Sequence, residues 1–209
     1  VTTDFWENRF KAEGKVWGGE PSNSVNIARD IFNKHGVHNV YIPGIGYGRN
    51  ALFFKDKGYD VAGTEISPTA INILKEQAPD IRVKNQSALD VFADNEFFEA
   101  IYCFNVLHLF KLAERKKFIQ VCEQQLKQNG IGFFVVFSEK EASYGKGQCV
   151  EENTFESKPG RPVHYFNEQD IKNHFTNFEI LDLGIINDRE NHGQGPHEHI
   201  LRFIAVRKR

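Results

Sequence analysis

Residues 40–65 read VYIPGIGYGRNALFFKDKGYDVAGTE, and this stretch determines the fold that we expect. A short apolar run at residues 40–42 suits a buried strand. It leads through Gly44-Ile45-Gly46-Tyr47-Gly48 into a helical pattern that ends at Gly58. Glycines at alternate positions let the backbone turn tightly and approach a ligand, and the helix that follows presents unpaired N–H groups at its start. The stretch therefore predicts a ligand-binding loop between a strand and a helix.

An acidic residue follows the loop at an informative distance. A second strand is expected at residues 59–64, and Glu65 directly follows it, 21 positions after Gly44. An acid at a spacing of about 20 residues reaches the ribose hydroxyls of a bound nucleotide. Loops that bind a dinucleotide usually read G-x-G-x-x-G, whereas Arg49 stands here at the third glycine position. The loop therefore departs from the dinucleotide pattern.

The motif G-x-G-x-G, taken with Glu65, resembles the cofactor loop of class I S-adenosylmethionine (SAM) methyltransferases, whose ligand has a ribose and an adenine but no phosphate. The form IPGIGYGRN, with a proline before the loop, is similar to the tellurite-resistance, thiopurine and thiol methyltransferase branch. Most class I members carry an acid two residues before the first glycine, where this chain has Ile42. The resemblance implies that the cofactor is held by Gly44, Gly46, Gly48, Arg49, Asn50, Glu65, Ile66 and Phe104.

Strands and helices are expected to alternate along the chain. The expected strands are 40–42, 59–64, 81–83, 97–104 and 131–137, followed by two closing strands at 178–186 and 199–206. Helices are expected from Ser24 to Gly36, from the glycine loop to Gly58, from Ser67 to Gln77, from Phe118 to Asn129-Gly130, and from Asn167 to Phe175. This order predicts a single α/β domain over residues 1–209, Rossmann-like and doubly wound. Its seven-stranded sheet is mostly parallel with a C-terminal antiparallel hairpin, the architecture that the resemblance implies.

Four further residues are candidates for the cofactor and reaction sites. Ser87 and Ala88 occupy the positions at which the family holds the adenine amino group, although a serine hydroxyl binds more weakly than a carboxylate, and Asp90 nearby is an alternative. Asn105 and His108 follow the strand at 97–104, where ligands bind in open α/β sheets. The pKa of a histidine suits a proton acceptor, so His108 is either a catalytic base or a structural histidine.

The N-terminal segment, residues 1–23, is rich in aromatic side chains. Its Trp6, Phe10 and Trp17 either cap the core or form a lid that excludes water from the methyl donor and acceptor. The pattern FWENRF followed by VWGGEPS resembles the N-terminal segment of the tellurite-resistance and thiopurine relatives. We therefore interpret residues 1–23 as a lid with three candidate substrate contacts.

The remaining acceptor candidates come from two long polar connections. Residues 138–163 are too long for a simple connection. The motif GRPVHYF at residues 160–166 resembles a signature of the tellurite-resistance-like branch. The connection and this motif contribute four candidate acceptor contacts, Tyr144, Arg161, His164 and Tyr165. Each of them can instead be a surface anchor. The loop between the closing strands holds His192, His197 and His199. We interpret that loop as a cover for the acceptor pocket, with His197 as a contact, rather than as a metal site, because no cysteine accompanies the histidines.

Composition gives weaker expectations. A formal charge of -2 offers no electrostatic reason to expect nucleic acid or an acidic membrane as a partner. No apolar stretch approaches the length of a membrane span, no leader opens the chain, and the three cysteines are widely separated and odd in number. We therefore expect a cytosolic protein with a small-molecule substrate, and oligomeric state is not predicted.

The sequence thus favours a SAM-dependent methyltransferase acting on a small molecule. The branch resemblance suggests a thiol or an oxyanion of a chalcogen or metalloid as the acceptor. One alternative is an NAD(P)-dependent Rossmann oxidoreductase, which Arg49 and the closing hairpin disfavour. The other is a SAM-binding module without catalytic activity, which Ile42 and Ser87 favour.

Overall fold

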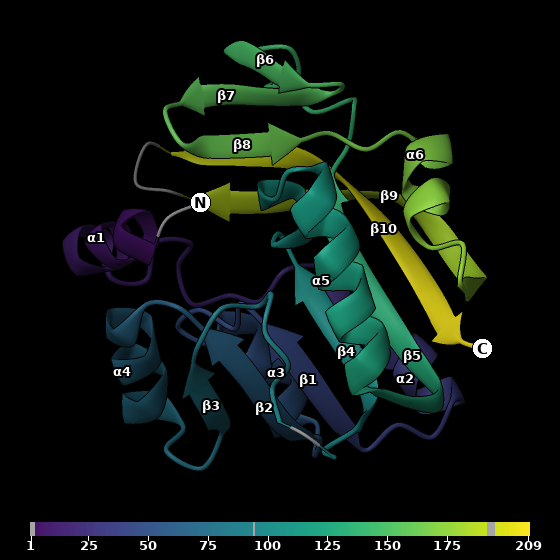
Figure 1. Cartoon of the computed structure of the whole chain (residues 1–209). Coiled ribbons are helices and arrows are strands. Elements are labelled where there is room, and N and C mark those ends of the chain that lie inside the picture. The colour runs from purple at the N-terminus through teal and green to yellow at the C-terminus, as the bar shows by residue number, and fades with distance from the viewer. Residues whose placement is uncertain (1–2, 94, 192–194) are drawn as a thin grey trace.

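A computed structural model describes residues 3–93, 95–191 and 195–209. Its main sheet has seven strands in the order β3-β2-β1-β4-β5-β10-β9 (Figure 1). The strands are β1 (Asn39–Pro43), β2 (Asp60–Glu65), β3 (Arg82–Asn85), β4 (Phe98–Phe104), β5 (Leu126–Phe137), β9 (Phe178–Asn191) and β10 (Pro196–Lys208). Strands β1 to β5 pair in parallel, and β10 is antiparallel to both β5 and β9. The predicted α/β fold with a closing antiparallel hairpin is confirmed.

Helices cover both faces of the sheet, as the alternation of strands and helices requires. They are α1 (Thr3–Glu13), α2 (Ser24–Lys34), α3 (Arg49–Asp56), α4 (Pro68–Gln77), the 3-10 turn η1 (Leu107–Leu109), α5 (Leu112–Gln125) and α6 (Glu168–His174). Successive residues of a strand point to opposite faces. In β1, Ile42 joins a core cluster with Phe54 of α3, and Tyr41 joins the other cluster with Phe118 of α5. None of the helices among the described residues combines the length and apolar character needed to cross a membrane.

Two of the three predicted helix caps are confirmed. The Ser67 hydroxyl accepts a hydrogen bond from the Ala70 N–H at 3.1 Å, and the Asn167 amide oxygen accepts one from the Asp170 N–H at 2.8 Å. Ser24 is not a cap but the first residue of α2. Its hydroxyl lies 2.7 Å from the hydroxyl of Tyr102, so it serves a buried contact with the sheet instead.

The structure differs most from the sequence prediction in three regions of the chain. Helix α5 ends at Gln125, and β5 begins directly after it with Leu126. The predicted helix stop at Asn129, whose φ is 62°, therefore lies within β5, where a register shift against β4 accommodates the turn. The closing strands are longer than predicted, since they continue past the core as a two-stranded extension of the hairpin. Residues 138–163, expected as an irregular excursion, contain most of a second sheet with the order β6-β7-β8.

The second sheet is antiparallel and consists of β6 (Gln148–Glu151), β7 (Thr154–Lys158) and β8 (Arg161–His164). Figure 1 shows this sheet and α1 at the end of the main sheet toward which β2 and β4 point. Ligands of open α/β sheets bind beyond the carboxyl ends of the strands, where the strand order reverses. That reversal lies here between β1 and β4, so α1 and the second sheet lie over the expected ligand position.

Candidate active site

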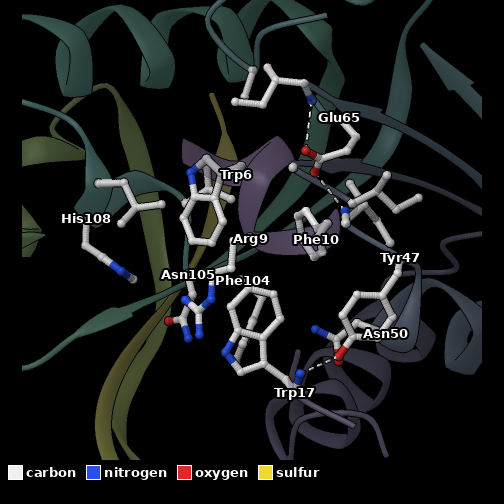
Figure 2. Close-up of a pocket in the computed structure, with 18 of the residues that line it drawn as sticks. Trp6, Arg9, Phe10, Trp17, Tyr47, Asn50, Glu65, Phe104, Asn105 and His108 are labelled. Carbon is white, nitrogen blue, oxygen red and sulfur yellow. Dashed lines mark hydrogen bonds between the residues drawn. The ribbon is translucent and has the colours of Figure 1, made fainter. Parts of the chain in front are cut away.

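A cavity of about 540 Å³ opens at the carboxyl ends of the parallel strands. Its walls come from the glycine loop, the ends of β2 and β4, helix α1, the second sheet and the closing hairpin. In Figure 2, the ring of Trp6 lies between Glu65 on one side and His108 on the other. Glu65 and His108 therefore mark two separate ends of the cavity.

The glycine loop has the backbone geometry that its sequence predicts. Gly44, Gly46 and Gly48 have φ values of 66°, 59° and 91°, a region that other residues rarely adopt. A Cβ on Gly44 would lie 2.6 Å from the Cγ2 of Val106, whereas the nearest atom to a Cβ on Gly46 is the Phe10 Cζ, 4.0 Å away. The loop therefore packs tightly at Gly44 and opens toward the cavity at Gly46.

Glu65 is bound by the glycine loop and by the two residues that follow it. Its Oε2 accepts a hydrogen bond from the Gly46 N–H at 3.0 Å, and its Oε1 accepts from the Ile66 and Ser67 N–H groups at 2.9 Å each. Glu65 as a residue is 6% exposed, and burial raises the pKa of its carboxyl group despite these three donors. Carboxylate oxygens have further lone pairs, so Glu65 can still accept hydrogen bonds from ligand hydroxyls.

Arg49 and Asn50 line the cavity, and both also form polar contacts with other parts of the protein. Arg49 forms a buried ion pair with Glu190 of β9 and donates to the carbonyl oxygen of Trp17 at 3.2 Å. Its guanidinium carbon lies 5.3 Å from the centre of the Phe104 ring. The amide oxygen of Asn50 accepts from the Ser22 N–H at 2.9 Å. These two residues fasten the N-terminal segment and the closing hairpin to the glycine loop.

The remaining residues predicted for the cofactor also line the cavity. Ile66, Ser87, Ala88 and Phe104 all belong to its wall. The Ser87 hydroxyl accepts from the Leu89 N–H at 3.1 Å, which orients the turn after β3. Gln86, which the sequence reasoning did not single out, lies beside them in the wall.

Asn105 and His108 place unpartnered polar atoms at the other end of the cavity. The Oδ1 of Asn105 and the Nδ1 of His108 are buried and have no hydrogen-bond partner among the described residues. Asn105 has a φ of 56°, and its N–H donates to the Val135 carbonyl oxygen at 3.0 Å. His108 stacks on Phe137 at 4.4 Å between ring centres. Burial holds the pKa of His108 well below its ordinary value, so its imidazole is neutral near pH 7 and a weaker base than the sequence suggested.

The N-terminal segment supplies an aromatic wall. Trp6, Phe10 and Trp17 all line the cavity, together with Tyr47 of the glycine loop. The Trp17 ring stacks on the Tyr47 ring at 6.2 Å between ring centres, and the backbone N–H of Trp17 donates to the Tyr47 hydroxyl at 3.0 Å. Helix α1 is held in place by Glu7, whose carboxylate accepts hydrogen bonds at the start of α4.

Three of the predicted acceptor contacts lie away from the cavity. His164 is buried, with Nδ1 2.8 Å from the Thr154 hydroxyl and Nε2 2.7 Å from the Asp170 carboxylate, so neither nitrogen is available to a ligand. The Tyr165 hydroxyl donates to the Ser143 hydroxyl at 2.9 Å within the packing of the second sheet. Tyr144 is 41% exposed and is not part of the cavity wall, and its hydroxyl donates to the amide oxygen of Asn153 at 2.8 Å.

Arg161 and His197, in contrast, belong to the cavity wall. His197 and His199 point to the same side, with 3.1 Å between their Nε2 atoms, and the Nδ1 of His199 lies 3.1 Å from the Glu141 carboxylate. His192 lies outside the described residues. Among the residues that the structure describes, no group of three or more histidine, cysteine or acidic side chains is arranged to hold a metal ion.

Sequence reasoning did not select several charged residues of the cavity wall. They are Arg9, Glu114, Glu141, Lys158 and Glu190. Arg9 lies one helical turn from Trp6, which was selected, so helical spacing offered a signal for it. Glu190 lies next to the histidine-rich loop between the closing strands, whereas no local pattern marked Glu114, Glu141 or Lys158.

The comparisons with known proteins agree with this geometry. The family model of a methyltransferase domain matches residues 40–130, from β1 into β5. No curated protein matches the chain in sequence. Solved structures match over nearly the whole chain, although at low sequence identity.

One similar structure comes from work on the conversion of a disulfide bond into a thioacetal group during echinomycin biosynthesis. It has a TM-score of 0.78 and 18% identity, and the match covers 99% of this chain and 93% of that one. Another is the 1,6-didemethyltoxoflavin-N1-methyltransferase of Burkholderia thailandensis with bound S-adenosylhomocysteine, at a TM-score of 0.72, 16% identity, and coverage of 99% and 86%. TehB from Haemophilus influenzae matches with a TM-score of 0.65, 17% identity, and coverage of 98% and 67%. The chain therefore has the fold of SAM-dependent methyltransferases.

Proposed function

We propose that the protein is a SAM-dependent methyltransferase that transfers a methyl group to a small-molecule acceptor. The observation that carries this proposal is the glycine loop with Glu65 at one end of a cavity whose other end holds Asn105 and His108. The methyltransferase-domain match of residues 40–130 and the solved methyltransferases of the same fold support it.

The residues present fit the cofactor. The open backbone at Gly46 leaves room for a ligand, and Glu65 would accept hydrogen bonds from the ribose hydroxyls. Ile66, Ser87 and Ala88 would surround the adenine. The buried Oδ1 of Asn105 would accept a hydrogen bond from the bound cofactor or acceptor. When bound, SAM supplies an activated methyl group on a sulfonium.

The chain's own residues would align the two reactants and exclude water. The aromatic wall of residues 1–23 acts as a lid over the reacting atoms, which raises the rate of a transfer that is limited by positioning. His108, as a neutral imidazole, orients the acceptor through a hydrogen bond rather than removing a proton of ordinary acidity. For an acceptor we favour a thiol or an oxyanion of a chalcogen or metalloid, because such nucleophiles need little help from a base.

A labelled-methyl assay tests the proposal. The purified protein is incubated with methyl-labelled SAM and with separate thiols, amines and chalcogen oxyanions, and labelled product is quantified. Turnover of at least one thiol or oxyanion is expected, and His108→Ala should lower it. Binding of S-adenosylhomocysteine without turnover of any acceptor would favour the SAM-binding module. Binding of NAD in place of S-adenosylhomocysteine would favour the oxidoreductase and overturn the proposal.

A further inference from the structure

Arg161 occupies the acceptor side of the cavity. It is the first residue of β8, and it belongs to the cavity wall together with His108 and Arg9. Strand β8 packs on η1, the turn that carries His108, through the contact of Val163 with Leu109. The guanidinium carbon of Arg161 also lies 5.4 Å from the ring centre of Phe5 in α1. Arg161 is thus fixed between the lid helix and the turn of His108.

The charge of Arg161 is not balanced by the protein. Its Nε is buried and has no hydrogen-bond partner, and no carboxylate among residues 3–93, 95–191 and 195–209 lies within ion-pair distance of it. The other two arginines of the wall differ, because Arg49 pairs with Glu190 and Arg9 lies 3.5 Å from Glu13. Among the described residues of this wall, Arg161 and the exposed Lys158 have no carboxylate within ion-pair distance, and only Arg161 has a buried nitrogen without a hydrogen-bond partner.

The acidic residues of the cavity wall are engaged elsewhere. Glu65 accepts three backbone N–H groups, as described above. Glu141 accepts from the Ile200 N–H at 2.7 Å and lies beside His199. Glu114 accepts from the Lys111 N–H at 3.2 Å, at the start of α5. None of these carboxylates is directed to Arg161.

Burial makes this arrangement costly without a ligand. Burial, with a smaller effect of the like charge on Arg9, lowers the pKa of Arg161. Arg161 as a whole is half-buried, but a cation whose Nε is buried without a partner is unfavourable, and an anionic ligand reduces that penalty. The planar guanidinium offers parallel N–H donors that match a carboxylate or another oxyanion.

We propose that the acceptor carries an anionic group, a carboxylate or an inorganic oxyanion, and that Arg161 binds this group beside His108. This inference rests on the proposed function, because it assigns the acceptor half of the same cavity. It also gives the second sheet a role, since β8 places Arg161 in the cavity wall. The specificity for charge would thus come from the polar connection in which the sequence analysis placed candidate acceptor contacts.

The test is a fluorescence titration of the whole protein, in which Trp6 and Trp17 of the cavity wall report binding. The protein is saturated with S-adenosylhomocysteine and titrated with benzoate, with its neutral isostere benzamide, with selenite and with inorganic phosphate. At least one anion should bind, and benzoate should bind more tightly than benzamide if the group is a carboxylate. Arg161→Met should weaken binding of that anion by about tenfold or more.

Matched variants separate the proposal from general effects on the fold. Arg161→Lys keeps the charge and should retain part of the affinity, and it replaces the methionine variant if that variant does not fold. Arg189→Met removes an exposed arginine on β9 and should change nothing. S-adenosylhomocysteine should bind equally to all variants, because Arg161 is assigned to the acceptor.

The contrary outcomes are distinct. The inference is wrong if no anion binds in the millimolar range, or if Arg161→Met keeps full affinity. It is also wrong if the anions change the tryptophan fluorescence no more than benzamide or buffer without selenite does. A loss of S-adenosylhomocysteine binding in Arg161→Met would assign the guanidinium to the carboxylate of the cofactor and would also overturn it. If the wild-type protein does not bind S-adenosylhomocysteine, the proposed function fails, and the anion titration without it still decides the role of Arg161.

Discussion

Substitution of Glu65 by glutamine separates the structural role of this residue from its role in binding. The carboxylate accepts three backbone N–H groups at 2.9–3.0 Å. Glutamine replaces one carboxylate oxygen by an NH₂ group, so the N–H groups on that side lose their acceptor. Loss of a buried, charge-assisted hydrogen bond costs about 1–3 kcal/mol of folding free energy. The variant should therefore unfold at lower denaturant concentration.

Ligand binding should fall in addition. If Glu65 holds the ribose hydroxyls, the glutamine variant loses charge-assisted hydrogen bonds to the ligand, worth about 1–3 kcal/mol or roughly 5- to 150-fold in Kd. Calorimetric titration with S-adenosylhomocysteine measures this loss, with Glu76→Gln on the exposed side of α4 as the control. A stability loss with an unchanged Kd would refute the placement of the ribose and leave Glu65 as a support of the loop alone.

Three further predictions follow from the same geometry. Gly46→Ala and Gly58→Ala both force a positive φ on alanine, so each should lose about 1 kcal/mol of folding free energy. Only Gly46→Ala should weaken the binding of S-adenosylhomocysteine measured by calorimetry. Hydrogen bonds, chiefly from the Ser67 hydroxyl, lower the pKa of Glu7 from 4.5 to about 2. The stability that Glu7 gives to the packing of α1 is therefore complete above pH 4.5 and is lost as the pH falls toward 2. Tryptophan fluorescence against pH should show this change in the wild-type protein and not in Glu7→Gln. Arg49→Met leaves the buried Glu190 without its arginine and should cost about 3 kcal/mol in denaturant unfolding, and a second substitution, Glu190→Met, should restore most of it.

The glycine loop and its neighbours could be predicted because their signals are local. The order of strand, Gly44 to Gly48 and helix, with Glu65 at the next strand end, follows from chain geometry over a few residues. The caps at Ser67 and Asn167 were predictable for the same reason, since a cap bonds to a residue three positions away. The family resemblance supplied the ligand that these local signals leave open.

The second sheet and the contacts of His164 could not be predicted from local patterns. Strands β6 to β8 are short and largely polar, so they show neither a clean alternation nor an apolar run. His164 belongs to a motif that resembles a functional signature, yet Thr154 and Asp170 occupy both of its nitrogens. The motif indicates the element correctly, but only the fold shows that Arg161, not His164, reaches the cavity.

Long-range ion pairs are a second limit of sequence reasoning. Arg49 and Glu190 are 141 positions apart, and their pairing depends on β9 extending past the core. Arg49 was expected to contact the cofactor because it follows the glycine loop. Arg49 lies in the cavity wall, so its contact with the cofactor stays a prediction, while its charge is committed to Glu190 and to the Trp17 carbonyl oxygen.

The central claim is that the cavity beside the glycine loop binds SAM. Calorimetric titration of the purified protein with S-adenosylhomocysteine, with NAD in a parallel cell, tests it most directly. We predict saturable binding of S-adenosylhomocysteine with a one-to-one stoichiometry and no binding of NAD. Binding of NAD alone would contradict the assignment of the loop, of Glu65 and of the acceptor side that depends on them.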